Sequence, residues 1–461
     1  MRALVARAMD HVAPFVASLA EQPASDVEGG LAAARAMMEP MPEEGTAPEI
    51  VLARLFAEVI PKSFNAAGPG YLAYIPGGGV FASAVADLVG DAVNRYVGVW
   101  AAAPALAQLE ATCGRWLCDL AGYPPAARGL LTTGGSLANF TAVVTARVDR
   151  LADDFLGGTM YVSAQAHHSV HKAARLAGFP ARAVRAIATD ARYSVRVDAM
   201  AAAIAADRAA GKTPFLIVAS AGTTNTGAID DLEALADLAQ RERMWLHVDA
   251  AYGGFFLLTA RGRAAMRGIE RADSITLDPH KALFLPYGNG ALLVRDGETL
   301  RRAHELDAEY MPPTRAEPEH ADFCAISPEL SRDPRGLRLW LPLMLHGAAA
   351  FRAALDEKLD LAALATDLVR AIPHVRIVAA PQLTALAFRL EPPGLSDAER
   401  DALNTRWLDD VVARKRVFVR ATVLDGRVTP RLCILSFRTH EDRVRAACDD
   451  LAAVARELTA S

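Results

Sequence analysis

SITLDPHK, residues 274–281, ends an apolar, strand-like run on a lysine that directly follows a histidine. An earlier run, WLHVD at residues 245–249, ends in the same way on an aspartate. A lysine in such a place can form a Schiff base, and an aspartate can pair with a protonated pyridine nitrogen. The two runs predict an enzyme that holds pyridoxal 5'-phosphate (PLP) covalently through Lys281, with Asp249 as the partner of the ring nitrogen.

The scarcity of lysine strengthens this prediction. The chain has 49 lysines and arginines, of which only six are lysines. Because basic positions in this chain are nearly always arginine, chance is a poor explanation for a lysine inside an apolar motif.

Length and composition are typical of a large globular protein. The 461 residues predict two or three domains, and 52% hydrophobic with 22% charged residues allow a large core. A net charge of −5 gives no electrostatic reason to expect nucleic acid or an anionic membrane as a partner. No uncharged apolar run reaches the roughly 18 residues of a spanning helix, and the N-terminus has the pattern of an amphipathic helix rather than a signal peptide. The five cysteines lack CxxC and zinc spacing, which predicts a cytoplasmic location and no metal.

Strand and helix patterns alternate from about residue 105 onward. Strands are predicted at 159–163, 215–220, 245–249, 274–277 and 290–294, and helices at 106–121, 136–154, 169–177 and 232–241. Such alternation predicts an α/β fold with a mostly parallel sheet covered on both faces. Ligands of these sheets bind at the carboxyl ends of the strands, where Asp249 and Lys281 both fall.

The two ends of the chain differ from this middle part. Residues 1–60 are predicted to form helices joined by polar loops, and the Pro-rich segment 310–336 is predicted to be a functional lid. Beyond it, helices at 337–358, 361–371 and 441–458 and strands at 376–378, 385–390, 417–421 and 431–437 predict an α+β domain. The predicted division is an N-terminal helical arm (1–75), a large cofactor-binding domain (76–342) and a small C-terminal domain (343–461).

Two further motifs have residues suited to a cofactor. TTGGSLAN at residues 132–139 is a Gly-rich turn that leads into a helix, so Gly134, Gly135 and Ser136 can hold a phosphate; the alternative is a plain helix cap. AQAHHSVHK at residues 164–172 offers His167 for stacking on a ring. The spacing of His167 and His171 would also suit a metal, but no cysteine or carboxylate with ligand spacing lies nearby.

The remaining two motifs have simpler local alternatives. Thr224, in the hydroxyl-rich turn SAGTTNTG (residues 220–227), can bond to the cofactor or the substrate, although an ordinary turn explains it equally well. Asp249 alone would be read as a helix N-cap, but the small residues that follow it, including Ala251, leave room for a flat ring. No single motif is enough to predict a PLP site. The prediction rests on the order of all the motifs along one sheet.

This order of motifs resembles the group II PLP-dependent decarboxylases, the family of aromatic-L-amino-acid, histidine and glutamate decarboxylases. The short motifs that carry the resemblance are GYLAYIP (70–76), WAAAP (100–104), QAHHS (165–169) and DPHK (278–281). The resemblance implies the type I PLP fold and an obligate homodimer with active sites at the interface, wrapped by the N-terminal arm.

The resemblance also implies roles for individual residues. Lys281 would form the internal aldimine next to His280, Asp249 would pair with the ring nitrogen, and His167 and Ala251 would lie on opposite faces of the ring. Thr224 would lie near the ring, and the phosphate would be held by Gly134, Gly135 and Ser136. The expected reaction is decarboxylation of an L-amino acid to the amine and CO2. The apolar and aromatic residues Tyr74, Ile75 and Trp100 favour an aromatic substrate.

Two positions depart from the family pattern. Phe323 stands where the family's lid carries a tyrosine that is thought to protonate the substrate carbon. Phenylalanine at this position is associated with decarboxylation coupled to oxidative deamination, which gives an aldehyde; Tyr310 or His320 are alternative proton donors. Asp278 stands where many members have asparagine near the phosphate, and because a phosphate repels a carboxylate, its side chain is expected to point elsewhere.

Three other functions compete with this one. Aminotransfer and aldol cleavage use the same fold, and they differ in not releasing CO2 stoichiometrically with retention of the amine. A non-catalytic dimeric scaffold would not need Lys281, Asp249 and His167 together. A nicotinamide enzyme is disfavoured because no GxGxxG follows an early strand.

Overall fold

The computed structural model describes residues 1–305 and 321–460. These form two compact units. The larger unit comprises residues 79–360 and 379–385, and the smaller one comprises residues 1–78, 361–378 and 386–461. The predicted three-part division at residues 75 and 342 stays a prediction.

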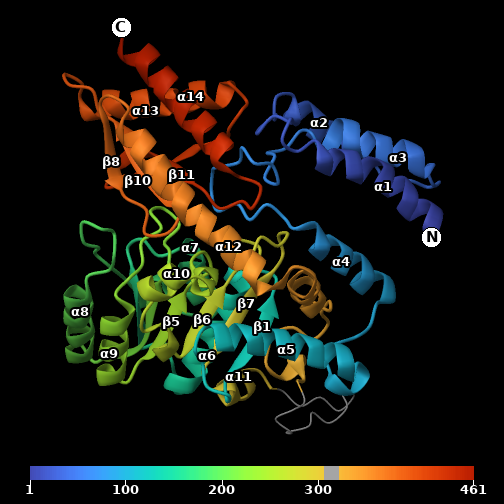
Figure 1. The fold of residues 1–461 in the computed structure, drawn as a ribbon. Helices are drawn as coiled ribbons and strands as arrows, with labels where there is room; N and C mark the ends of the chain where they lie inside the picture. The colour runs from blue at the N-terminus through green and yellow to red at the C-terminus, as the bar shows by residue number, and fades with distance from the viewer. Residues whose placement is uncertain (306–320, 461) are drawn as a thin grey trace. The chain divides into compact units, whose positions relative to one another are not determined.

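A seven-stranded sheet forms the centre of the larger unit (Figure 1). Its strands lie in the order β1-β7-β6-β5-β4-β2-β3, and their bounds are β1 Arg128–Thr132, β2 Gly158–Ser163, β3 Val184–Ile187, β4 Thr213–Ser220, β5 Trp245–Asp249, β6 Ser274–Leu277 and β7 Gly290–Val294. Only β7 runs antiparallel to its neighbours, β1 and β6. The prediction of a mostly parallel sheet is therefore confirmed.

Helices connect and cover these strands, and β2, β5, β6 and β7 are buried along their whole length. Their bounds are α4 Phe81–Val93, α5 Pro104–Leu120, α6 Gly135–Arg150, α7 His168–Leu176, α8 Val197–Ala209, α9 Leu232–Glu242, α10 Ala260–Ala265 and α11 Gly297–His304. The apolar faces of α6 and α7 pack with Met160, Phe215 and Leu292 of the sheet in one core cluster. These two helices therefore hold the segments that follow β1 and β2 firmly against the sheet.

The strand register brings the candidate residues to one edge of the sheet. Asp249 at the end of β5 lies opposite Ser220 of β4 and Thr276 of β6. At the other side, Thr132 at the end of β1 lies opposite Gly290 at the start of β7. The turns that follow β1, β4, β5 and β6 consequently meet at the same edge.

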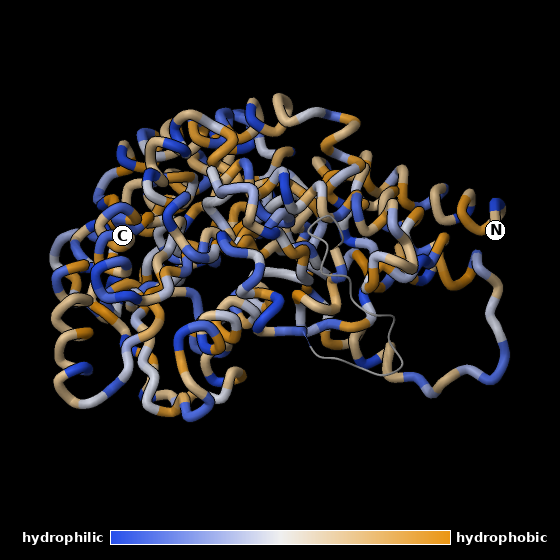
Figure 2. The backbone as a smooth tube through the Cα atoms, turned by 90° about the horizontal axis from the view of Figure 1, so that it is seen from below, coloured by the Kyte–Doolittle hydropathy of each residue, from blue (hydrophilic) through white to orange (hydrophobic). Residues whose placement is uncertain are grey.

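The smaller unit contains both ends of the chain. It includes the helices α1 Arg2–Ala17, α2 Gly30–Ala36, α3 Pro48–Arg54, α13 Asp397–Ala413 and α14 Glu441–Thr459, and the strands β8 Val375–Ala379, β9 Ala385–Leu390, β10 Arg420–Leu424 and β11 Arg427–Cys433. The strands form a second sheet in the order β10-β11-β9-β8, with Phe388 and Trp407 in the core beside it. Apolar and polar residues alternate along α1, as expected for an amphipathic helix (Figure 2), and Leu4 is 54% exposed.

Some predicted element boundaries were wrong. The helix pair predicted at 337–358 and 361–371 is α12, Gly336–Arg370, and its break lies at Gly347 (φ 71°), a left-handed conformation that favours glycine. The strands predicted at 417–421 and 431–437 are β10 and β11. The turn between them runs through Asp425 and Gly426, both of which have positive φ. An Asp-Gly pair between apolar runs is a strong hairpin signal, and it was overlooked.

Candidate active site

A cavity of about 360 Å³ lies at the carboxyl ends of β1, β4, β5 and β6 in the larger unit. Such a volume is in the range of small-molecule and cofactor sites. All nine residues predicted to contact the cofactor line it: Gly134, Gly135, Ser136, His167, Thr224, Asp249, Ala251, His280 and Lys281. Segments that are far apart in the sequence therefore converge on one site.

The Gly-rich turn between β1 and α6 depends on its glycines for space. A Cβ atom on Gly135 would lie 2.9 Å from a carboxylate oxygen of Asp278. A Cβ atom on Gly290, at the start of β7, would lie 2.5 Å from the backbone of Gly134. Gly134, Gly135 and Ser136 at the start of α6 line the cavity, and the helix dipole favours an anion at this end. The turn therefore fits a phosphate group.

Lys281 forms an ion pair at the floor of the cavity. Its Nζ lies 2.8 Å from Oδ2 of Asp278, and the two side chains are 22% and 3% exposed. Asp278 itself lines the cavity, so the expectation that its carboxylate points elsewhere was wrong. The attraction between the ammonium group and the carboxylate explains this orientation, since it compensates for the burial of both charges.

Asp249 is a buried carboxylate at the end of β5. Its Oδ2 accepts a hydrogen bond from Nδ2 of Asn139 (3.0 Å), and its Oδ1 accepts one from the backbone N–H of Ala251 (3.2 Å). No helix begins at Asp249, because the next helical turn starts at Gly254. The helix-cap explanation therefore does not account for this aspartate.

His167 caps α7 and faces the cavity as a neutral ring. Its Nδ1 accepts hydrogen bonds from the backbone N–H of Ser169 (3.3 Å) and lies 2.8 Å from the Ser169 hydroxyl. Burial is the main cause that lowers the pKa of His167 from its usual value, and Asp249 partly opposes it. A neutral ring in this place can stack on a flat heterocycle.

Two of the residues predicted for the substrate pocket lie outside this cavity. Phe323 is buried in a cluster with Ala107 and Leu130, and the guanidinium of Arg332 lies 4.5 Å from its ring centroid. Trp100 packs on the same cluster, and its backbone N–H donates to Asp322.

The other pocket candidates belong to different parts of the chain. Tyr74 and Ile75 are in the smaller unit, where Tyr74 is about half exposed and Ile75 is buried. The alternative proton donors Tyr310 and His320 are outside the described residues.

Sequence reasoning missed three polar residues of the site: Asn139 and Ser169, which line the cavity, and His247, which bonds to Asn139. All three are buried. A signal for Asn139 was available, because it lies one helical turn after Gly135 and therefore on the same face of α6 as the Gly-rich turn. For Ser169 and His247 the sequence gives no comparable signal.

No cluster of three histidines, cysteines or acidic residues suited to a metal occurs among residues 1–305 and 321–460. The same described residues contain no helix that is long and apolar enough to cross a membrane. His168 and His171 are exposed.

The donor set of the cavity fits PLP. Gly134, Gly135 and Ser136 at the positive end of α6 line the cavity, a Cβ atom on Gly135 would crowd it at 2.9 Å from Asp278, and the Lys281 amine and the Asp249 carboxylate line the same cavity. A Gly-rich turn, a buried carboxylate and a lysine amine at one sheet edge are the groups that a PLP-dependent enzyme of the type I fold requires.

Comparison with known proteins identifies the family. The model of the pyridoxal-dependent decarboxylase conserved domain matches residues 42–391. An aromatic-L-amino-acid decarboxylase of Bacillus atrophaeus is 34% identical over 100% of this chain and 96% of its own, and an L-2,4-diaminobutyrate decarboxylase of Rhizobium meliloti is 32% identical over 91% and 85%. The crystal structure of Oryza sativa TDC with PLP and tryptamine superposes with a TM-score of 0.94, at 27% identity, over 99% of this chain and 98% of that one. The chain belongs to the pyridoxal-dependent decarboxylases and is a PLP-dependent carboxy-lyase.

Proposed function

We propose that this enzyme decarboxylates an aromatic L-amino acid to the corresponding amine and CO2. The observation that carries the proposal is the convergence of Lys281, Asp249 and His167 on one cavity beside the Gly-rich turn. Relatives named for aromatic amino acids, and the aromatic side chains of Tyr74 and Trp100 among the predicted pocket residues, support the aromatic class.

Each residue of the cavity has a distinct task in this proposal. Bound PLP supplies the electron sink that accepts the electrons left at Cα when CO2 departs. Lys281 provides the amine that attaches the cofactor, and the Asp249 carboxylate keeps a proton on the ring nitrogen. The lining residues that complete the site are Gly134, Gly135 and Ser136 for the phosphate, His167 and Ala251 for the ring faces, Thr224 near the ring, and His280 beside the lysine.

We further propose that the active enzyme is a homodimer whose sites lie at the interface. The resemblance to the decarboxylase family, whose members are obligate dimers with active sites at the interface, supports this proposal. The exposed apolar side chains of α1, among them Leu4 and Met9, give the N-terminal segment a surface for packing on that copy. All five cysteines are free, in keeping with a cytoplasmic location.

A second candidate reaction follows from Phe323, whose ring carries no proton to transfer. In that reaction the amino acid, O2 and water give the aldehyde, CO2, ammonia and hydrogen peroxide. O2 is reduced to peroxide, while the Cα–carboxylate and Cα–nitrogen bonds break and the carbonyl oxygen comes from water. The tyrosine that is absent at position 323 is the observation that favours it.

Product analysis of the PLP-loaded enzyme separates the two reactions. Tryptophan, tyrosine, phenylalanine, histidine, glutamate and 2,4-diaminobutyrate are offered as L-amino acids, and CO2, amine, aldehyde, ammonia and peroxide are measured together. Amine equal to CO2 supports simple decarboxylation, and aldehyde with ammonia and peroxide supports the second reaction. The visible absorption of the lysine-bound cofactor disappears in Lys281→Ala. Absence of CO2 release from every aromatic amino acid would overturn the aromatic assignment.

A further inference from the structure

We propose that Asn139 is a positioning residue whose single side-chain amide fixes both Asp249 and His167. The inference rests on the proposed roles of those two residues. Asn139 lies on α6 and is 1% exposed. Its Nδ2 donates to Oδ2 of Asp249 (3.0 Å) and to Oγ of Ser169 (2.8 Å).

The orientation of this amide is determined by its partners. A carboxylate oxygen of Asp249 can only accept a hydrogen bond, so the amide nitrogen must face it. The amide oxygen then faces the other way, where it accepts from the hydroxyl of Thr276 (2.7 Å) and from Nε2 of His247 (3.0 Å). The side chain therefore uses both of its N–H donors and receives two hydrogen bonds at its oxygen.

Residues behind Asn139 fix the state of His247. The indole Nε1 of Trp245 can only donate, and it bonds to Oγ of Ser274 at 2.8 Å. The Ser274 hydroxyl is therefore free to donate to Nδ1 of His247, also at 2.8 Å. His247 then carries its proton on Nε2 and is neutral, in agreement with burial, which lowers the pKa of His247 to about 4.

The same logic fixes the protonation of His167. Because Oγ of Ser169 accepts from Asn139, its own proton is directed to Nδ1 of His167. The backbone N–H of Ser169 points at the same nitrogen. His167 is held as the neutral ring with its proton on Nε2. One chain of hydrogen bonds, from Trp245 to His167 with a branch to Asp249, thus runs in a single direction through Asn139.

Asn139→Asp tests the inference with almost no change in shape. It replaces the donating nitrogen with an oxygen that faces Asp249, so the two carboxyl groups repel each other or share a proton. The dissociation constant of PLP, measured by absorbance titration of the apo-protein, is expected to rise about tenfold or more. At saturating PLP, kcat is expected to fall about tenfold, with less than a threefold change in the KM of the amino acid.

Asn404→Asp is the matched control. Asn404 is also a buried amide, but it bonds to the backbone of Leu390 and Arg400 in the smaller unit. This variant is expected to lower Tm while PLP affinity and kcat stay within about twofold of the wild type. Wild-type PLP affinity and kcat in folded Asn139→Asp would overturn the inference.

Ser169→Ala is the second variant, and it decides the matter if Asn139→Asp does not fold. It removes only the branch to His167, so kcat is expected to fall severalfold while Asp249 keeps its bond to Asn139. Thr145→Val, on the same helix, serves as its control and is expected to leave kcat unchanged. An unchanged kcat in Ser169→Ala would contradict the proposed chain of hydrogen bonds from Asn139 to His167. Failure of the proposed function is separate, because it would appear in the wild type as the absence of CO2 release from every aromatic amino acid, while the PLP affinities of the wild type and Asn139→Asp could still be compared.

Discussion

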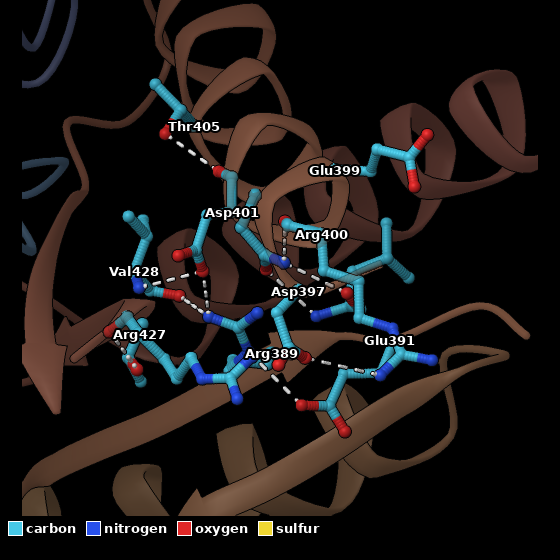
Figure 3. Close-up of polar contacts among 12 residues, drawn as sticks. Arg389, Glu391, Asp397, Glu399, Arg400, Asp401, Thr405, Arg427 and Val428 are labelled. Carbon is cyan, nitrogen blue, oxygen red and sulfur yellow. Dashed lines mark hydrogen bonds and ion pairs between the residues drawn. The ribbon is translucent and has the colours of Figure 1, made fainter. Parts of the chain in front are cut away.

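Two buried polar networks in this protein are built on opposite principles. The one around Asn139 in the larger unit consists of neutral hydrogen bonds and contains one carboxylate, Asp249. The one around Arg389 in the smaller unit consists of ion pairs (Figure 3). Arg389 on β9 is 2% exposed, lies 2.7 Å from Asp401 of α13, and also donates to the carbonyl of Val428 on β11.

The difference shows what each network is for. Ion pairs hold α13 to the sheet, and their energy depends on how far each pair is buried. A cofactor site needs groups held in a defined orientation. Neutral donors orient Asp249 and His167 without bringing further charges to the site. Substitutions in the two networks should therefore separate catalysis from stability.

The largest expected effect is on catalysis. Asp249→Ala removes the proposed partner of the ring nitrogen, so kcat is expected to fall about a thousandfold, a loss of about 4 kcal/mol in transition-state stabilisation. Steady-state kinetics at saturating PLP measure this, with circular dichroism as the control for folding. A fall of less than tenfold would mean that Asp249 is not the essential carboxylate of the site.

The matching substitution in the other network should affect stability instead. Asp401→Ala leaves the buried guanidinium of Arg389 without its strongest partner, and the unfolding free energy is expected to fall by about 3 kcal/mol. Urea denaturation measures the change, and kcat at saturating PLP should stay at the wild-type value. Loss of activity in a fully folded variant would contradict the division of roles.

Two buried histidines of the larger unit should make the protein less stable in acid. Burial lowers the pKa of His304 to about 4 from 6.5, and His247 is shifted in the same direction by the same cause. As the pH falls from 6.5 towards 4, the unfolded chain takes up protons at these histidines and the folded chain does not, so stability is lost in this window. At pH 5 the loss is about 2 kcal/mol for one such histidine.

His304→Gln should reduce this pH dependence, as measured by urea denaturation at pH 7.5 and 5. The Arg389 network should contribute little between pH 7.5 and 5. The hydrogen bond from Arg376 is the main cause that lowers the pKa of Glu391 from 4.5, so the stability that this group contributes is lost only as the pH falls below 4.5. A pH dependence that is equal in His304→Gln and the wild type would contradict this assignment.

The smallest effect on stability is expected for an exposed ion pair beside the Arg389 network. Arg427 pairs with Asp397 at an exposed site, where solvent screens the attraction. Arg427→Ala should leave Tm unchanged within error, in contrast to Asp401→Ala. A large decrease in Tm would mean that the exposed pair matters as much as the buried pair.

The catalytic strands were predictable because their patterns are local. The strands 245–249, 274–277 and 290–294 have the predicted bounds, and each is a short apolar run that ends at a polar or turn residue. β1, β3 and the Ala-rich helix α8 were not predicted, because their sequences show no clear hydrophobic periodicity. The break in α12 was predicted between residues 358 and 361, whereas it lies at Gly347. The glycine was not recognised as the break because glycine inside a helical pattern is often tolerated.

The sequence by itself determined the family of this protein, through a lysine and an aspartate at strand ends and a Gly-rich turn, each recognisable from its own neighbours in the chain. Only the tertiary structure decided how these groups are oriented. Asn139, Ser169 and His247 contact one another across α6, α7 and β5, and Asp278 turns towards Lys281. Such contacts depend on strand register and helix packing, and residues distant in sequence leave no local pattern that reveals them.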